Sequence, residues 1–471
     1  MSKRLRQWML LLLSVGLGAS FLRAEELTKQ ALDQIYQSAV ADYDAGRYAR
    51  AAEELERVLP YATKSFEVHE LLGMVYASLP DSAKAEEELK TAVQLNPNSA
   101  AARTNFGTIL LHAGKPALAA EQFRKAQQID PRDFDANHNL AESLLQAGKV
   151  AEARSFLVTA QELHPDSYDN GYDLAMADFQ LGQLDEARQT ALTIAQKQNT
   201  GEVHNLLAQI AEKQGKFVDA ANEYGAAAHL DPSEDNLFDW GSEMLLHRTY
   251  EPAITIFQDA TARYPKSPRL FIGLGLAQYS RGKYDDAVLA LLTAADLSPA
   301  DARCYLFLSK AYDSSPKLAD AVIRAFRRFV ELRPDDPRAH FYLAISLWKG
   351  NRAGDTSTDL KEVESLLLKS IALDGSVPEA HVQLGDLYSS EHDYERAIPE
   401  YVRAIALNPN LSDAHYRLGT DYVHVGKKDE AQREFAVYQK LRAEHLAEID
   451  KERAEVQQFV YSEKNNATAK F

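Results

Sequence analysis

Apolar residues recur at helical spacing along nearly the whole chain. In segments such as 101–132, AARTNFGTILLHAGKPALAAEQFRKAQQIDPR, apolar side chains return every three or four positions. This period is typical of a helix that buries one face. The strict alternation of apolar and polar residues expected of strands is missing. The pattern therefore predicts an all-α protein.

Turn residues divide this helical pattern into units of nearly constant length. Prolines stand mostly 33 to 35 residues apart, with two gaps close to double that spacing, at positions 97, 131, 165, 232, 265, 299, 334 and 409. Between them, glycines stand where a left-handed residue would end a helix; they are Gly46, Gly114, Gly148, Gly182, Gly215, Gly282 and Gly426. Each unit is predicted to be two helices joined by a turn and closed at the proline.

Two columns of small residues indicate that the helices of a unit cross closely. A small residue recurs at the eighth position, for example Gly107 and Gly385, and alanine recurs at the twentieth, for example Ala119 and Ala397. A large side chain there would push the two helices apart. Large apolar residues occupy the seventh and twenty-fourth positions, where they lie on one helix stripe and are expected to form the core.

A period near 34 with these columns closely resembles the tetratricopeptide repeat (TPR). The frame gives about twelve repeats over residues 32–445, followed by a capping helix and tail over 446–471. The resemblance implies a right-handed superhelical α-solenoid that binds other proteins, and it says little about the ligand. An insertion at 350–359 is expected to lengthen the turn within the tenth repeat.

The first residues have the layout of a signal peptide. Lys3, Arg4 and Arg6 precede an apolar run of 14 residues at 8–21. A spanning helix needs roughly 20 apolar residues, so cleavage after a signal peptide at 1–24 is the main prediction and an uncleaved anchor the alternative. The protein is therefore expected to be exported, either periplasmic or secreted, with membrane contact only through this segment if it is kept.

Composition and motifs argue against several other functions. The net charge of −17 disfavours binding to a nucleic-acid backbone. The single cysteine, Cys304, is expected to be a small core residue. No P-loop, HExxH or GxSxG motif is present, so we expect neither an enzyme nor a cofactor. Three histidines share the fourth position of consecutive repeats, too far apart for one metal, and are expected to pack like aromatic residues: His340, His381 and His415.

Basic residues mark the candidate binding surface. The resemblance implies that the first helix of each repeat lines the inner face. At the second position, three successive repeats carry Arg269, Arg303 and Arg338, and Lys310 and Lys349 lie on the same helices. Arginine near a helix N-terminus is unfavourable by about 0.3–1 kcal/mol. Either these residues bind an acidic partner segment, or neighbouring aspartates neutralise them.

Apolar side chains share this face in repeats seven to ten. They are Phe238, Ile272, Leu276, Tyr279, Phe341, Ile345 and Trp348. Such a stripe is either a contact surface or packing between adjacent first helices. The sequence thus predicts a non-enzymatic scaffold that binds a peptide or protein segment in a concave groove, with a few aromatic anchors. The alternative is a repeat subunit of an envelope export or assembly machine.

Overall fold

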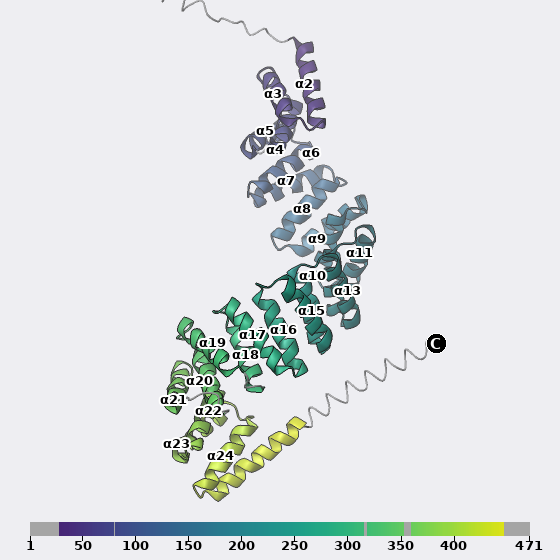
Figure 1. Cartoon of the computed structure of the whole chain (residues 1–471). Coiled ribbons are helices and arrows are strands. Elements are labelled where there is room, and N and C mark those ends of the chain that lie inside the picture. Colours follow the sequence, from purple (N-terminus) through teal and green to yellow (C-terminus); the bar gives the residue numbers. More distant parts are fainter. Residues whose placement is uncertain (1–27, 80, 315–317, 353–358, 447–471) are drawn as a thin grey trace, which may run out of the picture. The chain divides into compact units, whose positions relative to one another are not determined.

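The computed structural model describes residues 28–79, 81–314, 318–352 and 359–446. All regular structure within these ranges is helical (Figure 1). The predicted signal segment at 1–24 and nearly all of the predicted capping segment at 446–471 lie outside the described residues. The chain divides into two compact units, residues 1–216 and 217–471, and each is described by itself.

Unit 1 contains eleven α-helices in its described residues. They are α2 (Lys29–Asp44), α3 (Tyr48–Val58), α4 (Phe66–Ser78), α5 (Ser82–Leu95), α6 (Ala100–His112), α7 (Pro116–Ile129), α8 (Phe134–Gln146), α9 (Val150–Leu163), α10 (Tyr168–Gln180), α11 (Leu184–Lys197) and α12 (Gly201–Lys213). A short 3-10 turn, η1 (Leu59–Tyr61), follows α3.

Unit 2 continues the same alternation of first and second helices. It contains α13 (Phe217–Leu230), α14 (Glu234–Leu246), α15 (Tyr250–Arg263), α16 (Pro268–Arg281), α17 (Tyr284–Leu297), α18 (Ala302–Ser314), α19 (Ala319–Leu332), α20 (Pro337–Arg352), α21 (Leu360–Leu373), α22 (Pro378–Ser390), α23 (Tyr394–Leu407) and α24 (Ser412–His424). Residues 428–446 form a further helix. The boundary between the units falls after α12, the first helix of the sixth predicted repeat.

Packing within the repeats follows the predicted columns. The twentieth-position alanines are fully buried, among them Ala119 and Ala397. A Cβ added to Gly385 would lie 2.8 Å from Cε1 of Tyr401, the twenty-fourth residue of the same repeat. The eighth position must therefore be small because the two helices cross at the side chain of the twenty-fourth. Cys304 is also fully buried, as predicted.

The turns lie where the glycines and prolines of the sequence predict them. All seven glycines assigned to the first turn have positive φ, from 70° at Gly114 to 86° at Gly282. The described second helices that precede the prolines end two residues earlier, as α23 does at Leu407 before Pro409. The sequence therefore specifies both the start and the end of the second helix.

The insertion in the tenth repeat differs from expectation at its start. We expected a loop from residue 350, but α20 continues to Arg352 and is 16 residues long, against 13 for α18 and α22. Residues 353–358 lie outside the described part. The first part of the insertion is thus extra helix.

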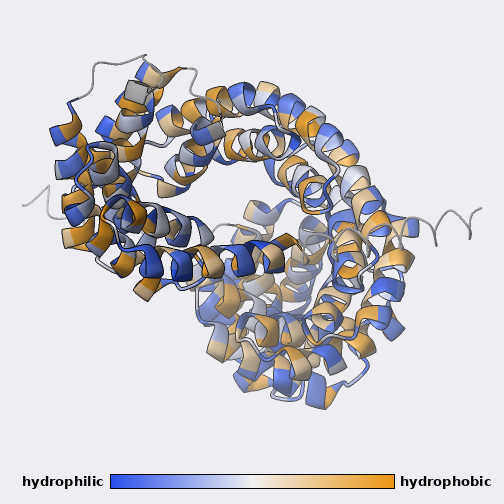
Figure 2. Cartoon of the chain, turned by 90° about the horizontal axis from the view of Figure 1, so that it is seen from below, coloured by the Kyte–Doolittle hydropathy of each residue, from blue (hydrophilic) through white to orange (hydrophobic). Residues whose placement is uncertain are grey.

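Hydrophobic and hydrophilic residues alternate along the helices in short stretches (Figure 2). This distribution is expected of helices that pack on one side and meet solvent on the other. Within the described residues, no helix combines the length and the apolar character required to cross a membrane.

Candidate functional site

The first helices of unit 2 form the surface that carries the predicted site. We call the surface made by α14, α16, α18, α20, α22 and α24 the first-helix face. Several successive members contact each other, as α16 contacts α18, α18 contacts α20 and α22 contacts α24. A cavity of about 700 Å³, the central pocket, opens where α18, α20 and α22 meet. Its lining is Ser309, Lys310, Tyr312, Asp313, Phe341, Ile345, Ser346, Trp348, Lys349, Glu379 and Gln383.

Aromatic and aliphatic side chains give the central pocket its apolar wall. Phe341 and Ile345 are half-buried and stand one helical turn apart on α20. Trp348 is 7% exposed and Tyr312 2%, so both belong mainly to the core and offer only part of their surface to the cavity. The pocket therefore has fixed aromatic residues and two accessible apolar side chains.

The two predicted lysines of the pocket differ in their surroundings. Lys349 Nζ donates to Asp313 Oδ1 at 2.9 Å and lies 5.8 Å from the centre of the Tyr312 ring. Lys310 is exposed, and among the described residues it has no ion-pair or hydrogen-bond partner. Lys310 is therefore the cation of this pocket that is available to a ligand.

The three predicted arginines are each paired with a carboxylate of their own chain. Arg269 Nε lies 2.6 Å from Glu234 Oε1, and the residue also contacts Asp235. In the next two repeats the pairs are Arg303 with Asp301, at 2.7 Å, and Arg338 with Asp336, at 3.0 Å. The hydrogen bond from Arg303 lowers the pKa of Asp301. These carboxylates offset the unfavourable electrostatic effect of an arginine near a helix N-terminus.

The other predicted apolar residues lie on α14 and α16, outside the central pocket. Ile272 is 8% exposed and part of the core. Leu276 and Tyr279 are half-buried, as is Phe238, whose ring centre lies 5.0 Å from the Arg269 guanidinium carbon. The structure thus places Phe341, Ile345 and Trp348 around one cavity with both lysines. The remaining seven predicted residues lie on unit 2 but do not line the central pocket.

A second cavity, the C-terminal pocket, was not predicted. It measures about 470 Å³ and is lined by Trp348, Leu360, Asp386, Ser389, Ser390, Tyr401, Tyr416, Arg417, Thr420 and Asp421. Trp348 lines both pockets, which are therefore neighbours on the first-helix face. The available sequence signal is Asp421, an acid in the tenth column, which is mostly apolar, with residues such as Val75 and Leu387, although the seventh repeat has Glu243 there.

Polar contacts fill one side of the C-terminal pocket. Asp386 binds Arg417 and accepts a hydrogen bond of 2.7 Å from the Tyr401 hydroxyl. Asp421 is 1% exposed; its Oδ1 accepts from Ser389 Oγ at 2.8 Å, and its Oδ2 has no hydrogen-bond partner. Burial raises the pKa of the Asp421 carboxyl, although the Ser389 hydroxyl and His424 act in the opposite direction.

The fourth-position histidines are buried but make polar contacts. His381 Nδ1 and His415 Nδ1 each lie 2.6 Å from a glutamate 19 residues later, Glu400 and Glu434 respectively. His340 Nε2 lies 2.8 Å from the Pro334 carbonyl oxygen. The expectation of simple aromatic packing was therefore incomplete. In the described part of the chain, no group of three or more His, Cys, Asp or Glu residues could hold a metal ion.

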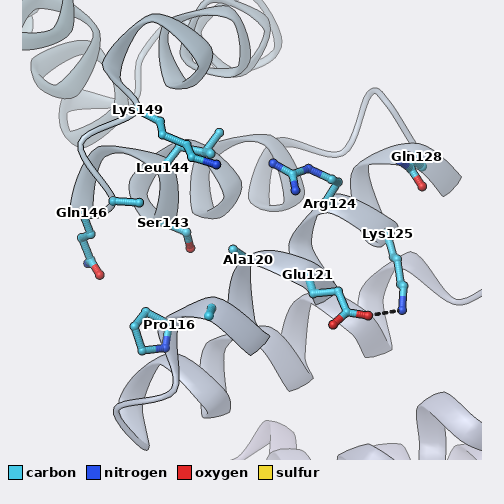
Figure 3. Close-up of a pocket in the computed structure, with 12 residues that line it drawn as sticks. Pro116, Ala120, Glu121, Arg124, Lys125, Gln128, Ser143, Leu144, Gln146 and Lys149 are labelled. Carbon is cyan, nitrogen blue, oxygen red and sulfur yellow. Dashed lines mark hydrogen bonds and ion pairs between the residues drawn. The ribbon is translucent and has the colours of Figure 1, made fainter.

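Unit 1 has a separate pocket between α7 and α8, of about 620 Å³. Figure 3 shows Arg124 and Lys149 extending toward each other from opposite sides of it, with Glu121 bound to Lys125. Arg124 is engaged by Glu152 at 2.8 Å, and the floor is made of small residues such as Ala120. None of the predicted site residues lies here.

Family models match both units. One tetratricopeptide-repeat model matches residues 110–168 and 144–210, and a second matches 36–100, 73–134, 247–302 and 308–355. A TPR-repeat model matches 385–423. Together the matches cover more than half of the chain. The protein therefore belongs to the tetratricopeptide-repeat family, and its many helix pairs are repeats of that family.

Individual relatives are distant. Superkiller protein 3 of Schizosaccharomyces pombe is 27% identical over 139 residues, which are 29% of this chain and 10% of that protein. The chain thus matches about a tenth of the length of this curated relative. Among solved structures, the C-terminal part of a TPR repeat-containing protein from Cytophaga hutchinsonii is 18% identical, with a TM-score of 0.43, covering 61% of this chain and 99% of that one. Pseudomonas aeruginosa PilF is 21% identical, with a TM-score of 0.39 and coverages of 43% and 93%.

Proposed function

We propose that the protein is a non-enzymatic scaffold that binds an extended segment of a partner protein on the first-helix face of unit 2. The observation that carries the proposal is the central pocket. It combines half-buried apolar side chains, fixed aromatic residues and the accessible cation of Lys310. Partially exposed aromatic anchors beside a polar group are typical of surfaces that hold a peptide.

The proposed partner places an apolar side chain against Phe341 and Ile345 and a carboxylate near Lys310. Arg269, Arg303 and Arg338 extend the basic character along α16, α18 and α20. Because each arginine already has a carboxylate partner, we expect its contribution to be exchange of one ion pair for another. Such exchange supplies direction and selectivity more than affinity.

A comparison of variants in native cells tests this proposal. Lys310→Glu with Phe341→Ala reverses the free charge and removes the accessible ring, whereas Lys369→Glu with Val402→Ala makes matched changes on second helices of the same unit. Both control side chains are exposed. Affinity purification with quantitative mass spectrometry should show a partner at least tenfold depleted from the first variant, since anchor residues contribute at least about 1.4 kcal/mol.

Equal recovery of every partner by the two variants would contradict the proposal. Far-UV circular dichroism of both purified variants checks that each remains helical. Arg269→Gln, Arg303→Gln and Arg338→Gln together should stay folded, because exposed ion pairs contribute only about 0–1 kcal/mol each. This triple variant should weaken binding of an acidic partner chiefly at low salt.

We also propose that the chain is exported. The support is the order of charges and apolar residues at 1–24, described above. Sequencing the N-terminus of the protein from cells should give Ser20 or Glu25 as the first residue. A chain that still begins with Met1 in the cytoplasmic fraction contradicts export. Co-purification with an intact membrane complex would instead favour the role of a subunit in an envelope export or assembly machine.

A further inference from the structure

The C-terminal pocket contains a buried carboxylate whose interactions are incomplete. Asp421, on α24, is 1% exposed and lines the pocket, and its Oδ2 has no hydrogen-bond partner. A buried polar atom without a partner is destabilising, and more so when it is charged. The folded protein therefore holds an acceptor that a bound group could satisfy.

The neighbouring carboxylate is fully compensated, so the deficit belongs to Asp421. Asp386 has the guanidinium of Arg417 and the hydroxyl of Tyr401. Asp421 has only the hydroxyl of Ser389. The two carboxylates and one guanidinium leave the pocket with a net charge of −1 when both acids are ionised.

The other groups near Asp421 do not cancel this charge. Asp386 and Ser389 approach from α22, Tyr401 from α23, and His424 and Arg417 share α24 with Asp421. Arg417 is bound to Asp386. In the described part of the chain, it makes no hydrogen bond to Asp421 Oδ2. Burial raises the pKa of Asp421, which is the behaviour of a carboxylate that lacks a counter-charge.

We propose that the C-terminal pocket is a subsite for a lysine or arginine side chain of the bound partner segment, with Asp421 as its counter-ion. This inference rests on the proposed function and gives the partner's chemistry and direction. Trp348 separates the two pockets, so the partner's apolar residue lies over Phe341 and its basic residue passes Trp348 to reach Asp421. Its acidic group then lies toward Lys310, at the opposite end.

The pocket offers the contacts that a basic side chain needs. Tyr416 is 50% exposed at the pocket and supplies an aromatic face for the aliphatic stem or the cation. Ser390 and Thr420 supply hydroxyl groups. A guanidinium or ammonium group would gain a charge-assisted hydrogen bond with Asp421, which is stronger than a neutral one.

Selection of peptides from a random phage-displayed library on the full chain tests the inference. Peptides that bind the wild type and not the Lys310→Glu, Phe341→Ala variant define the ligands of this face. We expect these peptides to carry lysine or arginine at a fixed distance from an apolar residue. Selection on Asp421→Asn should lose the basic position and keep the apolar one, whereas Asp429→Asn, an exposed control, should keep both.

A double-mutant cycle then measures the contact directly. For a selected peptide, replacing the basic residue by norleucine should weaken binding about tenfold or more in fluorescence anisotropy. The same replacement in the peptide should have little effect on its affinity for the Asp421→Asn variant. Affinity should rise as the pH rises through the titration of Asp421, because the ionised form binds the cation.

The outcomes separate the two proposals. If no peptide depends on Lys310 and Phe341, the proposed function fails, and this subsite fails with it. If such peptides bind but show no basic position, or if Asp421→Asn leaves the basic preference intact, only the subsite is wrong. Affinity that falls with rising pH would also overturn it, since that result means a protonated Asp421 donates to a partner carbonyl.

Discussion

Asp421 makes the stability of the last repeat depend on pH, and Asp421→Asn tests this. Burial raises the pKa of the folded carboxyl above its ordinary value of 3.8. Between these two values the folded state binds more protons than the unfolded state, so stability falls as the pH rises. Asparagine does not titrate, and its oxygen can still accept from Ser389. The variant should therefore gain stability relative to the wild type from about pH 4 upward.

The size of the effect follows from how far burial raises the pKa of the carboxyl. At low pH, the protonated wild type has an O–H where the variant has an amide N–H, and both are unpaired buried donors with similar costs. At a pH where the folded carboxyl is ionised, the wild type carries a buried charge, and the variant should be more stable by about 1.4 kcal/mol for each pH unit by which folding raises that pKa. Exposed Asp429→Asn should show no such change with pH.

Hydrogen exchange is the appropriate assay because repeat arrays open locally from their ends. Protection of amides in α24 and in residues 428–446, corrected for intrinsic exchange rates, should differ between Asp421→Asn and wild type more at pH 7 than at pH 4. A difference that is independent of pH would refute the reasoning. So would a wild type that becomes the more stable protein as the pH rises.

Two glycine substitutions in unit 2 separate close packing from backbone conformation. Gly385→Ala places a Cβ 2.8 Å from Tyr401, a ring that is 1% exposed; overpacking of about 1–3 kcal/mol, less about 1 kcal/mol of helix propensity, should lower stability in urea denaturation. Gly426→Ala has no atom within 4 Å of its Cβ but a φ of 79°, and should cost about 1–2 kcal/mol through the backbone alone. Asparagine, which tolerates left-handed φ, should recover stability at 426 and not at 385; recovery at both positions would contradict the two mechanisms.

The fold was predictable because the residues that determine it lie within each repeat. Position eight is small where it meets the twenty-fourth side chain, as Gly385 meets Tyr401. The turn glycines have positive φ, and each proline follows a helix end. These rules are local and recur in most repeats, so the predicted fold does not depend on any single repeat. The helical start of the insertion at 350–352 escaped because it belongs to no column.

The site was less predictable because exposure depends on neighbouring repeats. Sequence position alone places Ile272 and Trp348 on the same face as Phe341, yet both are largely buried by adjacent helices. Sequence alone also left open whether the three arginines are free or neutralised by neighbouring aspartates, and in the structure each has a carboxylate close by. Asp421 was visible as an acid in a mostly apolar column, which it shares with Glu243, but the missing partner of its Oδ2 is a property of three-dimensional packing.

Site-specific photo-crosslinking tests the central claim most directly. Benzoylphenylalanine is placed at position 383, on α22 in the lining of the central pocket, and separately at position 369, on the exposed surface of α21. We expect the probe at 383 to capture a defined protein in cells, through a segment that contains an apolar and a basic residue, and the probe at 369 not to capture it. Capture of the same protein from both positions, or from 369 alone, would contradict binding on the first-helix face.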